Sequence, residues 1–349
     1  MAGKEKEKKN TGGYNKFLMD LKAGTLENIY IFHGEESYLR QQYLEQLRAA
    51  LVPEGFEEFN YHRLQGKGLT MQELAEAVEA MPMMAERTLV TVSDLDIFKL
   101  DESGRNALME ILSDVPDYCV LVFLYDTIAY KRDGKMKKLC GVLDKFVQEV
   151  EFCEQERAAL VKWVRRRVLA TDHDIDTLTI DHLLFTCGTL MTDLVPEIAK
   201  IAAYAKGPNI TIADINAVAD PILDARVFDM TRCITDAKYD DAARILGDLL
   251  RMQESPIMIV AAIGKELRKL YTARLALDNG KDKNWLKQVW GIKDYPAELL
   301  LKAARKVDHA WCSRAVQQCQ VLDRRLKSET GMDKEAALKL FLMELAGTR

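Results

Sequence analysis

The sequence lacks the patterns that mark several large classes of protein. Its 349 residues contain no run approaching the ~20 apolar residues of a membrane helix, and no apolar run is flanked like a signal peptide. Its seven cysteines include no C-x-x-C pair, and its five histidines include no H-x-x-x-H spacing. These absences argue against a membrane protein, a disulfide framework and a zinc site, and they indicate a protein of the reducing cytoplasm.

The residues of known catalytic machinery are also missing. Nothing resembles a Ser-His-Asp or Cys-His arrangement, and no pair of acids can be placed across a cleft. We therefore expect no catalysis by the chain's own residues, and neither a cofactor nor a metal. The hydrophobic share of 48% and the charged share of 30% describe an ordinary globular protein, and the length favours two or three domains.

A strand followed by a glycine and a helix is the most informative pattern present. Residues 28–34 (NIYIFHG) predict a buried strand that ends in Gly34, and Glu35, Glu36 and Ser37 then open a helix. A phosphate-binding loop needs a second glycine and a lysine at set spacing, and both are absent here. Two carboxylates at a helix N-terminus would repel a triphosphate. The sequence therefore predicts a degenerate phosphate-binding loop that holds no nucleotide.

Strands and helices alternate up to about residue 153, and only helices follow. We expect strands at 29–32, 58–64, 87–92, 118–125 and 146–152. Continuous apolar strands between helices imply an α/β domain with a mainly parallel sheet covered on both faces. The expected organisation is a flexible tail at 1–13, the α/β domain at 14–153, a small helical domain at 154–220 and a helical C-terminal domain at 221–349.

This order of domains resembles the clamp-loader branch of the AAA+ proteins. Local sequences are similar to those of bacterial DNA polymerase III delta subunits over about residues 28–345. The similar segments are 30–39 (YIFHGEESYL), 194–200 (LVPEIAK), 228–250 and 322–327 (LDRRLK). The resemblance implies an AAA+-like first domain, a helical lid and an all-α collar that serves oligomerisation.

The resemblance also implies a contact site and a function. In that family an adjacent apolar pair binds a hydrophobic pocket of the sliding clamp, and by position the pair is Met83 and Met84, which follow the helix-stopping Pro82. The family often has Leu-Phe or Phe-Phe there, and an arbitrary pair of methionines would more often be core. The implied role is to bind and open the beta sliding clamp for DNA replication without hydrolysing ATP. The implied partners are the ATPase subunits (tau/gamma), delta-prime and primer–template DNA.

Acidic residues follow two strands at the edge where nucleotide enzymes hold magnesium. Asp94 and Asp96 come after the strand at 87–92, and Asp126 comes after the strand at 118–125. The ordinary alternative is that they cap the helices that follow, since Asp is a preferred N-cap residue. We favour the alternative because the phosphate-binding groups are missing.

Two basic groups could contact nucleic acid. One is Lys131, Arg132 and Lys135, and the other is Arg165 and Arg166 beside Trp163. Net charge is −5 overall, with +5 from residue 221 onward and −10 before it. An acidic front disfavours DNA binding by that part, and a charged run is often only a solvated turn.

Two further interpretations remain open. An ATPase or nucleotide switch with a divergent loop predicts nucleotide binding. A helical scaffold or nucleic-acid adaptor leaves the α/β domain without a role. Nucleotide binding distinguishes the first from a clamp-loader subunit, and clamp binding distinguishes the second.

Overall fold

The computed structural model describes residues 11–347, which form two compact units. The first unit contains the chain up to Gln155 together with Leu190–Thr192, and the second contains Glu156–Thr189 and the chain from Asp193 onward. A division of the helical part at residue 220 stays a prediction. Among residues 11–347, no helix is both long enough and apolar enough to cross a membrane.

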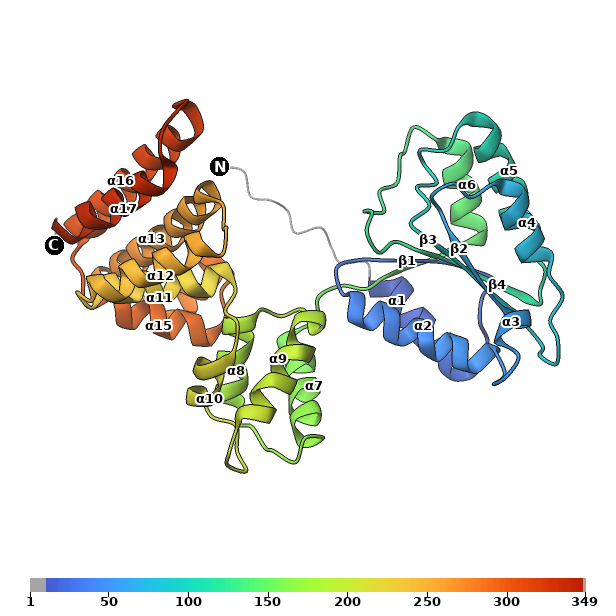
Figure 1. The fold of residues 1–349 in the computed structure, drawn as a ribbon, viewed down its shortest axis with the longest axis horizontal. Helices are drawn as coiled ribbons and strands as arrows, with labels where there is room; N and C mark the ends of the chain where they lie inside the picture. Colours follow the sequence, from blue (N-terminus) through green and yellow to red (C-terminus); the bar gives the residue numbers. More distant parts are fainter. Residues whose placement is uncertain (1–10, 348–349) are drawn as a thin grey trace. The chain divides into compact units, whose positions relative to one another are not determined.

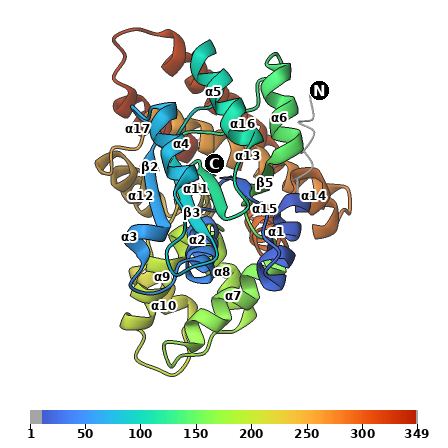
Figure 2. The same cartoon turned by 90° about the vertical axis from the view of Figure 1, so that its right-hand side faces the viewer.

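A parallel sheet is the centre of the first unit (Figures 1 and 2). Within the described residues it has five strands: β1 (Ile29–His33), β2 (Tyr61–Gln65), β3 (Thr88–Ser93), β4 (Cys119–Leu124) and β5 (Gln148–Glu151). Their order is β2-β3-β4-β1-β5, and every neighbouring pair is parallel. All strands therefore end at one edge, the carboxyl edge, and begin at the other, the amino edge. The predicted α/β class is confirmed.

Helices cover both faces of the sheet (Figure 1). They are α1 (Thr11–Ala23), α2 (Ser37–Leu51), α4 (Met71–Glu79), α5 (Glu102–Ser113) and α6 (Lys137–Phe146). On one face, α4, α5 and α6 contribute Leu74, Leu108 and Leu139 to an apolar core. On the other face, Phe17 of α1 makes edge-to-face contacts with Tyr30 and Phe32 of β1. Strand β4, which is apolar throughout, is consequently buried on both sides.

The second unit is helical in its described residues. Its helices are α7 (Arg157–Leu169), α8 (Thr177–Cys187), α9 (Met191–Tyr204, whose first two residues belong to the first unit), α10 (Ile212–Val218), α11 (Leu223–Thr235), α12 (Tyr239–Arg251), α13 (Pro256–Asp278), α14 (Lys283–Trp290), α15 (Asp294–Ala304), α16 (His309–Ser328) and α17 (Lys334–Gly347). The long helix α13 packs against α11, α15 and α16, and Leu267 and Leu270 lie buried in that core.

Two local predictions are wrong. Residues 58–64 are not one strand, because Glu57–Asn60 form a helical turn, α3, and β2 begins only at Tyr61. Residues 11–13 of the predicted tail belong to α1. Gly13 lies so close to β5 that an added Cβ would meet the Glu149 carbonyl oxygen at 2.0 Å. The rest of the predicted tail, residues 1–10, lies outside the described residues.

Candidate partner-binding site

The loop between α4 and β3 exposes the two predicted contact residues. Helix α4 begins with a capping box formed by Thr70 and Glu73. The helix ends at Glu79, and the loop that follows lies at the amino edge of the sheet. Met83 is 47% exposed and Met84 is 77% exposed. The alternative that both methionines are core residues is therefore wrong.

This loop is fixed at its middle and at its C-terminal end by hydrogen bonds to other segments. In the middle, the Asn60 amide accepts from the Met83 backbone N–H at 2.7 Å and donates to the Met83 backbone carbonyl at 2.8 Å. At the C-terminal end, the Arg87 guanidinium donates to the carbonyl oxygens of Asp117 and Leu26 at 2.9 Å and 3.1 Å. The methionines are thus displayed by a held loop.

An open groove begins where the loop ends. It has a volume of about 720 Å³, and its lining includes Ala85, Glu86 and Arg87, which follow the methionines directly. Apolar atoms of Leu21, Leu26, Leu51 and Pro53 also face it. Two further apolar side chains of this edge are exposed: Met81 and Phe59, the latter at 50%. The amino edge therefore combines exposed apolar groups with a concave surface, as partner-binding surfaces commonly do.

At the opposite, carboxyl edge, the predicted degenerate loop is built around Gly34. Its φ of +114° favours glycine, and an added Cβ would meet the Phe152 carbonyl oxygen at 2.4 Å. The Phe152 N–H donates to the His33 carbonyl, and the Phe152 carbonyl accepts from the Glu36 N–H. Gly34 is therefore required by a close crossing of the chain, which explains the glycine without any phosphate.

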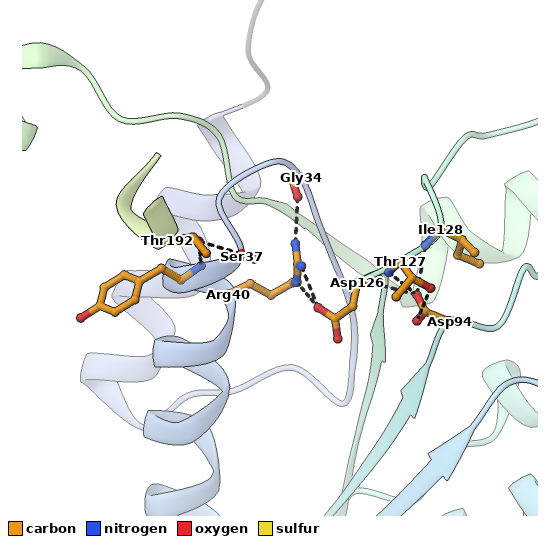
Figure 3. A network of polar contacts seen from close by, with 9 residues as sticks. Gly34, Ser37, Arg40, Asp94, Asp126, Thr127, Ile128 and Thr192 are labelled. Atoms are coloured by element: carbon orange, nitrogen blue, oxygen red, sulfur yellow. Dashed lines mark hydrogen bonds and ion pairs between the residues drawn. The ribbon is translucent and has the colours of Figure 1, made fainter. Parts of the chain in front are cut away.

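An ion-pair network occupies the space beside Gly34 (Figure 3). Arg40 of α2 is buried, with 3% of its side chain exposed, and it pairs with Asp126 at 2.7 Å. The same guanidinium donates to the Gly34 carbonyl at 2.8 Å. A buried arginine thus ties the glycine turn to the loop after β4, and its charge is neutralised within the protein.

Asp94 follows β3, where a nucleotide enzyme would hold magnesium. Its carboxylate is instead hydrogen-bonded by the loop after β4 (Figure 3). Its carboxylate accepts from the backbone N–H groups of Asp126, Thr127 and Ile128, and from the Thr127 hydroxyl at 2.8 Å. Burial alone would raise the pKa of Asp94, but these hydrogen bonds outweigh it and lower the pKa. Asp94 therefore holds a loop, and a magnesium ion would have to displace these donors.

The prediction that these acids cap helices is wrong. The N-cap of α5 is Asp101, whose carboxylate accepts from the Gly104 N–H, and the N-cap of α6 is Met136. Asp96 instead pairs with Lys99 on the surface. Over residues 11–347, no three His, Cys, Asp or Glu side chains are grouped so that they could hold a metal ion.

The remaining residues of the degenerate loop also bond within the first unit. Glu36 is fully buried, and its carboxylate accepts from the Met191 N–H at 3.0 Å. The Ser37 hydroxyl lies 2.7 Å from the Thr192 hydroxyl (Figure 3). Glu35 is exposed. The loop therefore presents a free carboxylate to solvent and uses its other polar groups internally, which does not fit a bound triphosphate.

The predicted DNA-contact residues of the first unit lie at the edge of the sheet opposite the methionines. Arg132 follows β4, at the carboxyl edge, and pairs with Asp144 at 2.7 Å. Lys131 and Lys135 beside it are exposed, and the Asp133 carboxylate closes a turn there. Arg165 and Arg166 lie exposed on α7, in the second unit. Contact of either group with DNA stays a prediction.

The sequence did not reveal the roles of Asn60 and Arg40. The pattern predicts Asn60 within a strand, and it predicts Arg40 only as a helix residue. Their partners lie far away in the chain, at Met83 and Asp126. A signal for Arg40 existed, since an arginine on an apolar helix face beside a degenerate loop needs an acidic partner.

Fold and site together define an α/β protein of the nucleotide-binding kind in which an internal ion pair replaces the phosphate-binding groups. A family model described as "DNA polymerase III, delta subunit" matches residues 30–151, and one for the C-terminal domain of that subunit matches residues 224–345. Together the two matches cover more than half of the chain. The chain belongs to the DNA polymerase III delta subunit family.

Individual relatives agree with this assignment. The chain is 24% identical over 334 residues to DNA polymerase III subunit delta of Bacillus subtilis, covering 93% of this chain and 94% of that protein. It is 22% identical over 290 residues to the probable delta subunit of Aquifex aeolicus, covering 81% of each. Among solved structures, the Bacillus subtilis DNA clamp loader delta protein is similar at 22% identity and a TM-score of 0.47, covering 95% of this chain and 99% of that one.

Proposed function

We propose that this protein is a clamp-loader subunit that binds the ring-shaped beta sliding clamp through Met83 and Met84. The observation that carries the proposal is the exposure of this adjacent apolar pair on a loop held by hydrogen bonds at Met83 and at Arg87. Each methionine buried in a pocket of the clamp contributes about 1.5–3 kcal/mol of transfer free energy. Methionine also adapts its shape to irregular apolar pockets.

Binding energy, and no chemistry of this chain, performs the proposed work. The Met pair anchors the first unit to the clamp, and the neighbouring amino-edge surface favours the distorted, open ring over the closed one. A ligand shifts such an equilibrium only by its difference in affinity for the two states. The surface around the pair must therefore fit the open ring better than the closed ring.

The proposed partners follow from family membership. ATP is bound and hydrolysed by the tau/gamma subunits, and the C-terminal helices pack with those subunits and with delta-prime. Primer–template DNA is contacted in the assembled loader. The self-satisfied carboxyl edge, with Arg40 paired to Asp126, supports a subunit that does not itself hydrolyse ATP.

Surface plasmon resonance of the full chain on an immobilised bacterial sliding clamp, without nucleotide, tests the proposal. The Met83→Ala, Met84→Ala double variant is expected to bind at least about 100-fold more weakly, because two buried side chains are lost. The matched control is Met252→Ala, Met258→Ala, which removes two exposed methionines from the second unit.

The control is expected to bind like the wild type, and circular dichroism establishes that each variant is folded. Absence of binding by the wild type, both alone and assembled with ATPase subunits, would contradict the proposed function. Equal binding by the double variant would leave a clamp contact but move it away from the methionines.

A further inference from the structure

A buried side chain from a different segment holds the backbone of the predicted contact loop. Asn60, at the end of α3, is fully buried, and its amide faces the chain at Met83. We propose that Asn60 is a positioning residue that keeps Met83 and Met84 in the conformation that binds the partner. This inference rests on the proposed function and adds a residue of this chain that the function depends on.

The amide of Asn60 uses its donor and its acceptor on the same residue. Its Oδ1 accepts from the Met83 N–H at 2.7 Å, and its Nδ2 donates to the Met83 carbonyl at 2.8 Å. The second Nδ2 hydrogen is directed to the Phe56 carbonyl at 3.1 Å. This pairing copies the two hydrogen bonds that a neighbouring strand would make. A carboxylate, which only accepts, and an apolar side chain, which does neither, cannot reproduce it.

The residue held in this way is followed by an unusual backbone conformation. Met84 has a φ of +55°, in the left-handed region that few residues other than glycine adopt. The two hydrogen bonds at Met83 therefore fix the chain just before the bend that turns the Met84 side chain outward, where it is 77% exposed. Without them the loop would relax, and ordering it again would weaken association.

The position of α3 links the held loop to a second exposed group. Phe59, the residue before Asn60, is 50% exposed, although Asn60 itself is fully buried. One buried amide thus joins two segments of the amino edge, each of which exposes apolar side chains. The amide therefore holds the loop at the place where apolar side chains of both segments are exposed.

Clamp binding by Asn60 variants of the full chain tests the inference. Asn60→Ala is expected to weaken binding about tenfold, since ordering even one released residue costs on that scale. Asn60→Asp keeps the acceptor for the Met83 N–H but places a buried carboxylate oxygen against the carbonyls of Met83 and Phe56, so it is expected to bind no better than Asn60→Ala. The matched control is Leu108→Ala, which removes a fully buried side chain of α5 in the same unit.

Two readouts separate positioning from general stability. Leu108→Ala is expected to lower the urea midpoint at least as much as Asn60→Ala does, yet to bind the clamp within about twofold of the wild type. Hydrogen exchange at the Met83 amide, which donates to Asn60, should accelerate in Asn60→Ala and remain slow in Leu108→Ala. In the Met84→Ala background, Asn60→Ala should lose much of its effect on binding, because Asn60 acts through that loop.

The outcomes distinguish the two proposals. If the wild type binds and the methionine variants do not, but Asn60→Ala binds like Leu108→Ala, the positioning role is wrong and the proposed function stands. If the wild type itself does not bind, the proposed function fails and the inference fails with it. Unchanged exchange at Met83 in Asn60→Ala would overturn the inference whatever the binding result.

Discussion

The carboxyl edge and the amino edge of the parallel sheet use their loops in opposite ways. At the carboxyl edge, Arg40 pairs with Asp126, and the Asp126 N–H donates to Asp94. Gly34 packs directly against the backbone of Phe152. At the amino edge, polar groups such as the Asn60 amide serve to hold a loop whose apolar side chains remain exposed. One edge is saturated within the chain, while the other leaves apolar side chains exposed to solvent.

The difference matters because the carboxyl edge is where open α/β sheets bind their ligands. Here an ion pair and backbone hydrogen bonds occupy that edge. The proposed clamp contact uses the amino edge instead, at the other ends of the same strands.

Arg40→Ala tests the carboxyl edge and is expected to cause the largest loss of stability. The variant removes one partner of a pair that is buried on the Arg40 side and leaves the Gly34 carbonyl without this donor. Fully buried pairs cost about 3–5 kcal/mol when broken, and since Asp126 is partly exposed we expect a loss of about 2 kcal/mol. Urea unfolding measures this loss in the free energy of unfolding.

The control for Arg40→Ala is Arg48→Ala, which breaks an exposed pair with Glu45 on the same helix. That change should cost less than about 0.5 kcal/mol. Clamp binding should survive in both folded variants. Equal stability of the two variants would show that the Arg40–Asp126 pair does not stabilise the first unit.

Asp94→Asn should have a smaller effect that depends on pH. The folded-state pKa of Asp94 is lowered, so its contribution to stability is present above its unfolded pKa of about 4 and is lost as pH falls through the folded value. We expect a loss of about 1 kcal/mol at pH 7 from weakened hydrogen bonds to the charged group. Urea unfolding between pH 7 and pH 3 should show the difference from wild type shrinking at the acid end.

Asparagine tolerates the φ of +56° at this position, so backbone strain does not confuse the comparison. Asp96→Asn is the control, because its partner Lys99 is largely exposed. A difference between Asp94→Asn and wild type that stays constant down to pH 3 would contradict the role given to the Asp94 charge.

Addition of MgATP should leave the thermal stability of the protein unchanged. A nucleotide at 100 times its dissociation constant would stabilise the fold by about 2.7 kcal/mol. The degenerate loop offers Glu35 to solvent and keeps Glu36 buried. Thermal unfolding with millimolar MgATP is therefore expected to match unfolding without it. A saturable rise in Tm would break the comparison and favour a nucleotide switch.

The sequence allowed the sheet to be predicted because its strands are local, apolar runs. Strand β4 and the capping box of α4 are recognisable from adjacent residues alone. The α3 turn at Glu57–Asn60 was missed, since period-2 alternation cannot distinguish a single helical turn from the start of a strand. The family resemblance predicts Met83 and Met84 as contact residues, and the structure shows that both are exposed.

The supporting contacts could not be predicted in the same way. The amide of Asn60 meets Met83, and the guanidinium of Arg40 meets Asp126, only after the sheet has brought their segments together. Such pairs depend on side-chain direction at the ends of different strands. Hydrophobic patterns do not contain that information.

The close crossing at Gly34 also has a consequence for synthesis of the protein. The turn before α2 is completed by Phe152, which lies just beyond β5 and leaves the ribosome much later. Contacts between distant segments form slowly, since the intervening chain must first be ordered. The crossing at Gly34 therefore closes only after residue 152 has been synthesised, and a chain interrupted before that residue would lack the two Phe152 hydrogen bonds.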